Sequence, residues 1–191
     1  MPRATAERRL VPGDVVRAAA VGSLAVSIVA LGGVAGALFL LVLGGVLVPR
    51  FLGLPTALDL CFGSSLLVAA WASQLGWYEA VPWLDLLVHA VCTGLVAAVG
   101  VILMVRGQAL EAGALPGRAR AGLAATTMGI GALSAIVWEL GEWVGHTYLD
   151  EGIDVGYTDT VADLAFGLFG ATLTGVVLAV RDPAWRLGRD A

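Results

Sequence analysis

The feature that most constrains this chain is a series of long apolar stretches that hold almost no charge. Short segments between them carry nearly all of the Arg, Asp and Glu residues. Of the 191 residues, 59% are hydrophobic and 14% are charged, whereas a soluble domain is roughly a quarter charged. Such segregation is typical of a chain whose main solvent is lipid. The sequence therefore predicts an all-α polytopic transmembrane bundle and excludes a soluble enzyme.

The lengths of these stretches predict the number of helices. A helix needs about 20 apolar residues to cross a bilayer, with a range of roughly 17–25. Four later stretches fit one crossing each, at about residues 59–75, 83–105, 121–146 and 160–180. The first stretch, residues 15–48, is too long for one helix and slightly short for two. Gly32, Gly33 and Gly36 in its middle could form a tight turn, and Pro49 is expected to end it.

Charge in the connecting segments predicts the orientation, because cytoplasmic loops collect Arg and Lys. Basic residues lie in the head, at Arg50, in segment 106–120 and in the tail, whereas the segments around Glu79 and 150–154 hold acids and no Arg. Both termini are then cytoplasmic, which requires two crossings between residues 15 and 48. We therefore expect about six helices, with five as the alternative.

The same argument divides the chain into three parts. We expect a cytoplasmic N-terminal segment 1–14, a transmembrane bundle 15–181 and a cytoplasmic tail 182–191. The lipid bilayer is the main partner. The net charge of -4, with no basic face, excludes a nucleic-acid partner.

Common catalytic and binding motifs are absent from the sequence: there is no Walker loop, G-x-S-x-G elbow, H-E-x-x-H or C-x-x-C. Cys61 and Cys92 both fall inside apolar stretches, and we interpret them as buried small hydrophobes. The glycine patterns are typical of helix-packing surfaces, within the chain or in a homo-oligomer. They include Gly141-x-x-x-Gly145 and the glycines at 167, 170 and 175.

A few ionisable residues lie inside the predicted spans or at their mouths, where each costs about 2.5–3.5 kcal/mol at the centre of a helix. They are Asp85, His89, Glu139, Glu142, His146, Asp159 and Asp163. At 100° per residue, Asp85 and His89 lie about 40° apart on one helix face, and Glu139 and His146 differ by about 20°. Each group therefore points in one direction, as residues do when they line a common site.

The expected topology brings these groups to one level, in the outer half of the membrane. The candidate catalytic residues are Asp85, His89, Glu139, Glu142, Asp159 and Asp163. The candidate metal ligands are His89, Glu139, Glu142, His146 and Asp163. Carboxylate and imidazole ligands suit a divalent metal such as Zn, Mn or Fe.

Several of these residues also have a purely structural interpretation. Asp85 and Asp159 could complement a helix dipole, Thr160 and Asp163 fit a capping box, and His146 could simply be solvated. Glu139 is the hardest to explain in this way. It shares a face with Glu142, and two such acids cannot both ionise cheaply in an apolar setting without a proton or a cation between them.

Three stretches carry a family resemblance: WLDLLVH (83–89), WELGEW (138–143) and GYTDTVADLAFGLFGA (156–171). Together they resemble the YjdF-like family of bacterial inner-membrane proteins and, more distantly, VanZ-like proteins, a family associated with teicoplanin resistance. VanZ-like sequences tend to carry Gln where Glu142 stands, and a basic residue before the final Asp pair that is absent here. The resemblance implies a protein of the bacterial inner membrane, and it implies no reaction.

Three functions are consistent with the sequence. The first is a metal-dependent membrane enzyme acting on a lipid-linked or envelope small molecule. The second is a small proton- or ion-coupled transporter in which Glu139 and Glu142 relay protons. The third is a non-catalytic envelope scaffold whose polar cluster locks helices together.

Overall fold

The computed structural model describes residues 10–110 and 117–181, and every regular element in these ranges is an α-helix. The helices are α1 (Gly13–Ala30), α2 (Gly33–Leu52), α3 (Thr56–Gln74), α4 (Trp77–Ala80), α5 (Pro82–Arg106), α6 (Gly117–Tyr148) and α7 (Tyr157–Val180). All except the short α4 are long and apolar enough to cross a membrane. The predicted all-α bundle of six spans is confirmed. The predicted tail 182–191, and most of the predicted N-terminal segment, lie outside the described residues.

A tight turn at Gly32 divides the long first stretch into α1 and α2. Gly32 has a φ of 96°, a left-handed value that glycine adopts without steric cost. The amides of Leu31 and Gly32 both donate to the carbonyl of Ser27, at 2.9 and 3.0 Å, and end α1. The five-helix alternative is therefore wrong.

The expectation that Pro49 ends the first stretch is also wrong, because α2 continues through Pro49 to Leu52. Proline removes one backbone donor, but this does not prevent a final helical turn. The helix ends instead at Gly53, which has a φ of 55°. The Leu54 amide donates to the Pro49 carbonyl at 3.0 Å, which is the hydrogen bond of a left-handed helix cap.

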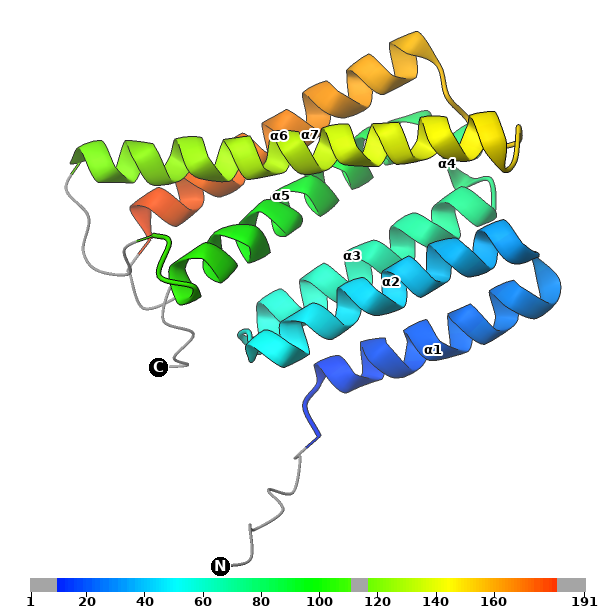
Figure 1. Cartoon of the computed structure of the whole chain (residues 1–191), viewed down its shortest axis with the longest axis horizontal. Coiled ribbons are helices and arrows are strands. Elements are labelled where there is room, and N and C mark those ends of the chain that lie inside the picture. The colour runs from blue at the N-terminus through cyan, green and yellow to red at the C-terminus, as the bar shows by residue number, and fades with distance from the viewer. Residues whose placement is uncertain (1–9, 111–116, 182–191) are drawn as a thin grey trace, which may run out of the picture.

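The six spans form two groups of three, α1–α3 and α5–α7, with α4 leading from one to the other (Figure 1). In the second group α7 packs extensively against α5 and α6, and the main contact between the groups is α3 against α5. Consecutive spans run in opposite directions, so the start of α1 and the end of α7 lie at the same end of the bundle. We name the opposite end, which contains α4 and the α6–α7 loop, the acidic end.

Glycines allow α7 to approach its neighbours closely. A Cβ atom at Gly170 would collide with the backbone carbonyl of Ala90 on α5, and one at Gly175 would lie 2.8 Å from the carbonyl of Ala124 on α6. These glycines form packing surfaces as predicted. Gly141 was also expected to pack, but a Cβ there would meet nothing within 4 Å. Gly141 lies on an exposed face of α6, so packing of Gly141 within the chain is wrong, and its packing in a homo-oligomer stays a prediction.

The two cysteine thiols are unpaired, and Cys61 is exposed rather than buried. The prediction of burial was wrong for Cys61 because a span surrounded by lipid can direct small apolar side chains outward at no cost. Cys92 is partly buried.

An ion-pair network joins α1 to α3 at the end of the bundle remote from the acidic end. The Arg17 Nη2 atom lies 2.6 Å from Asp59 Oδ1, and Arg17 Nη1 lies 3.1 Å from Asp14 Oδ1. The side chains of Arg17 and Asp59 are only 10% and 9% exposed. Gly13 makes room for them, since a Cβ atom there would overlap the Asp59 carboxylate. This network was not predicted from the sequence.

The orientation in the membrane can be tested with reporter fusions. Fusions after Arg50, within segment 106–120 and at the tail are expected to report a cytoplasmic location, because these segments are basic. Fusions near Glu79 and Asp154 are expected to report an external location. Alkaline phosphatase and green fluorescent protein fusions at these five positions measure this directly. A cytoplasmic signal at Asp154 would show that the bundle has the opposite orientation in the membrane.

Candidate functional site

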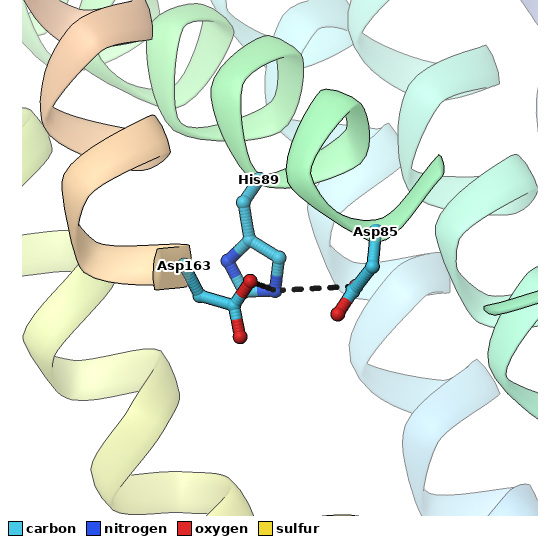
Figure 2. A group of neighbouring side chains, drawn as sticks. All are labelled: Asp85, His89 and Asp163. Atoms are coloured by element: carbon cyan, nitrogen blue, oxygen red, sulfur yellow. Dashed lines mark ion pairs between the residues drawn. The ribbon is translucent and has the colours of Figure 1, made fainter. Parts of the chain in front are cut away.

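Five polar side chains from three helices approach one another at the acidic end. The first turns of α5 supply Asp85 and His89, and their i,i+4 spacing places them on one face. The last turns of α6 supply Glu139 and Glu142, and α7 supplies Asp163. Figure 2 shows the imidazole of His89 between the carboxylates of Asp85 and Asp163.

His89 is at the centre of the group. Its Nε2 atom lies 3.6 Å from Asp85 Oδ1 and 3.9 Å from Asp163 Oδ1, and its Nδ1 atom lies 3.8 Å from Glu139 Oε1. The imidazole is only 11% exposed. Each distance exceeds the usual N–H···O range of about 2.7–3.2 Å. The two ring nitrogens therefore face different carboxylates without a close hydrogen bond to any of the three.

Two carboxylate oxygens in this group are buried and have no hydrogen-bond partner among the described residues: Glu139 Oε1 and Asp163 Oδ1. The Asp163 side chain is 3% exposed and the Glu139 side chain 10% exposed. A buried polar atom without a partner costs about 1–3 kcal/mol, and more if it is charged. Each of these oxygens is the atom that faces His89. The arrangement is consequently suited to a proton or a cation placed between the imidazole and the carboxylates.

The side chains offer two sets of three potential metal ligands. One set is Asp85, His89 and Asp163, and the other is His89, Glu139 and Glu142. Within each set the ligand atoms all lie within 4.8 Å of one another. A divalent metal holds nitrogen and oxygen ligands at about 2.0–2.2 Å, so ligands around one ion are roughly 3–4 Å apart. Small side-chain rotations would close either set around an ion, and His89 belongs to both.

The capping-box interpretation of Asp163 does not hold. Helix α7 begins at Tyr157 with Gly156 as its N-cap, and no side chain caps this end of the helix through a hydrogen bond. Asp163 lies almost two turns inside the helix, beyond the unpaired amides of the first turn. Its carboxylate faces His89 instead.

Two predicted site residues are outside both sets. The Nδ1 atom of His146 lies 2.6 Å from the carbonyl of Ile153, a contact that ties the end of α6 to the α6–α7 loop. Asp159 lies in the first turn of α7, where its charge favours the helix dipole. The structure therefore brings together Asp85, His89, Glu139, Glu142 and Asp163, and it does not bring His146 or Asp159 into either set.

A cavity of about 310 Å³ adjoins the group. Asp85, His89 and Glu142 contribute to its wall, whereas the rest of the lining is mostly aliphatic and comes mainly from α2, α3, α5 and α6. The cavity was not predicted from the sequence, because the positions that line it depend on how the two groups of helices pack together.

Tyr78, on the short helix α4, is a lining residue that was also not predicted from the sequence. Its hydroxyl donates to the carbonyl of Ala69 at 3.1 Å. Burial, with a smaller contribution from the negative charge of Asp85, raises the pKa of Tyr78 above its usual value, so the hydroxyl keeps its proton. A helix of four residues has no apolar periodicity, so no sequence pattern could have predicted which way Tyr78 points.

Comparison with known proteins gives a family and no function. No curated protein matches the chain, and no solved structure matches it. One family model, described as "Predicted membrane protein (DUF2238)", matches residues 15–183. That match covers the first span from residue 15 onward, the other five spans in full and every residue of the two ligand sets. The chain therefore belongs to this family of predicted membrane proteins.

Proposed function

We propose that this chain is a membrane-embedded, metal-dependent enzyme that acts on a lipid-linked or envelope small molecule. The observation that carries the proposal is the pair of buried, unpartnered carboxylate oxygens of Glu139 and Asp163, both facing His89. Such groups are rarely left unmatched in a protein interior. A divalent cation such as Zn, Mn or Fe would match them with a suitable ligand set.

The site residues would have separate roles in binding the metal and in transferring protons. His89 would hold the ion, either with Glu139 and Glu142 or with Asp85 and Asp163, and the ion would supply Lewis acidity or an activated water. With the first of these sets, Asp85 would not bind the ion and would be placed to accept or return a proton at the cavity wall. Asp159 stands near the mouth of the site, one helical turn before Asp163.

The family supports the proposed location. The YjdF-like resemblance of three stretches of the chain fits the match to a family of predicted membrane proteins. We accordingly propose a bacterial inner-membrane protein with both termini cytoplasmic and the acidic end facing outward. The acid-rich loops at that end and the basic segments at the other support this orientation.

One observation favours a proton- or ion-coupled carrier as a second candidate. Glu142 lines the cavity, whereas Asp163 is buried behind it, and His89 lies between the two ligand sets. An imidazole between acids is a common element of proton relays. In that case the unpartnered oxygens would hold protons, and the purified protein would contain no metal.

Elemental analysis of detergent-purified protein tests the metal. The wild-type protein is expected to contain a stoichiometric divalent metal, and Glu142→Gln is expected to reduce it severalfold, because Gln supplies no anionic ligand. Glu79→Gln is the matched control, since Glu79 is an exposed acid at the same end of the bundle. Metal-free wild-type protein that moves protons in liposomes would favour the carrier. Metal-free protein with no flux would favour the scaffold.

A further inference from the structure

The cavity has a polar end and an apolar end, and this polarity runs along the membrane normal. On α5 the lining residues run from Asp85 to Val96, and on α3 they run from Ser73 back to Phe62. Each stretch advances eleven residues, or roughly 17 Å at 1.5 Å per residue. That is about half of the 30 Å hydrocarbon core of a bilayer. The cavity therefore extends from the acidic end to about the middle of the membrane.

Its acidic and imidazole side chains are at the acidic end, where Asp85, His89 and Glu142 line it beside Tyr78. Deeper in the membrane the walls are formed mainly by aliphatic and aromatic side chains such as Phe62, Leu66 and Val96. A volume of about 310 Å³ corresponds to roughly ten water molecules of liquid. Spread over about 17 Å of depth, this space forms a slot that a single hydrocarbon chain fits.

The slot also reaches the lipid-facing surface of the bundle. Leu41 on α2 and Trp138 on α6 both line it, yet they are 62% and 39% exposed. The principal contact between the two helix groups is α3 against α5, so α2 and α6 lie on the less tightly packed side of the slot. A chain could therefore enter sideways from the bilayer.

We propose that the slot binds the single chain of a lipid phosphate, with the phosphate at the acidic end. This inference rests on the proposed metal-dependent function, because a phosphate beside Asp85 and Glu142 would be repelled unless a cation bridged them. A divalent ion held by His89 would attract the phosphate oxygens, and the chain would lie between α3 and α5. The proposed substrate class is thus a single-chain membrane lipid that carries a phosphate or diphosphate head.

Photolabelling of the full-length protein in phosphatidylcholine vesicles tests this assignment. The probes are dodecyl phosphate, dodecanol and dodecylamine, each with a diazirine in the chain, used with and without Zn²⁺ or Mn²⁺. Dodecyl phosphate is expected to label α3 and α5 in the presence of metal and to lose most of that labelling with chelator. Dodecanol is expected to label the same helices whether or not metal is present.

A variant that fills part of the slot tests whether the hydrocarbon chain binds there. Ala69→Leu adds bulk to the cavity wall and is expected to reduce labelling of α3 and α5 about tenfold at unchanged metal content, because the leucine side chain takes space that the hydrocarbon chain would fill. Val68→Leu is the matched control, since Val68 is 45% exposed on the same helix.

Three outcomes would overturn the inference. Equal labelling of Ala69→Leu and wild type at equal metal content would show that the chain does not occupy the slot. Stronger labelling by dodecylamine than by dodecyl phosphate in the presence of metal would show a cationic head instead. If the wild-type protein contains no metal but dodecanol still labels the slot specifically, the phosphate assignment is wrong. The slot would then bind a hydrocarbon chain, and the proposed metal site would be the part that fails.

Discussion

Replacing Arg17 by Met is expected to lower the free energy of unfolding by about 3–5 kcal/mol, the cost of leaving a buried charge without its partner. Asp59 is 9% exposed on its side chain, and Arg17 Nη2 is 2.6 Å from its Oδ1 atom. The hydrogen bond between these two side chains joins α1 directly to α3. Thermal and denaturant unfolding of the protein in a mild detergent measures the loss.

The double variant Arg17→Met with Asp59→Leu separates pairing from packing. Replacing both members of a buried ion pair by apolar residues is often neutral or stabilising. Asp14 would still accept from the Val11 amide, at 3.0 Å, and lie 3.8 Å from Arg50 Nε. The double variant is therefore expected to be close to wild type in stability. Arg118→Met, at an exposed arginine near the same end, is expected to leave stability unchanged.

A double-mutant cycle over Arg17 and Asp59 measures the coupling free energy between the two side chains. If Arg17→Met unfolds no more easily than Arg118→Met, the network contributes nothing to the fold. If the double variant is as unstable as Arg17→Met, the packing volume of Arg17 matters more than its charge.

The number of spans could be predicted because lipid imposes a simple rule on the sequence. A helix must be apolar for about 20 residues, and this requirement is visible without knowing any partner. The turn at Gly32 was predictable for a similar local reason, since a left-handed residue between two spans favours glycine. The end of α2 was not predictable from Pro49, because the cap depends on the conformation of Gly53.

The candidate site could be predicted in part because ionisable side chains inside a transmembrane helix cost free energy and therefore stand out in the sequence. Asp85, His89, Glu139 and Asp163 were chosen by cost and helical spacing, and the structure places the three carboxylates around the His89 imidazole. The same cost applies to Arg17 and Asp59. Their pairing was missed because they lie 42 residues apart, and spacing along one helix says nothing about a partner on another.

Which face of a span meets protein is the part that hydropathy does not reveal. In a soluble protein an apolar residue is expected to be buried. In a bilayer an apolar side chain can face either lipid or protein at little difference in free energy. Cys61 and Gly141 were assigned to packed surfaces and are exposed. The slot between the helix groups was missed for the same reason, since its aliphatic walls resemble any other apolar face.

His89→Ala is expected to have the largest effect on the site, a fall in bound metal from a stoichiometric level to background. His89 is the one residue common to both ligand sets, whereas Asp85→Asn disturbs one set and Glu139→Gln the other. Stabilisation of the wild-type protein by added metal is also expected to disappear. At a metal concentration 100 times Kd that stabilisation amounts to about 2.7 kcal/mol.

His146→Ala is the matched control, because the chain has two histidines and both were candidate ligands. The His146 Nδ1 atom lies 2.6 Å from the Ile153 carbonyl, so its loss should loosen the α6–α7 loop and leave metal content intact. Metal analysis and metal-dependent melting of the two variants, measured side by side, separate the alternatives. If His146→Ala loses the metal and His89→Ala retains it, the ion binds at the membrane surface. The unpartnered oxygens of Glu139 and Asp163 would then be sites for protons, and the carrier would become the better explanation of this protein.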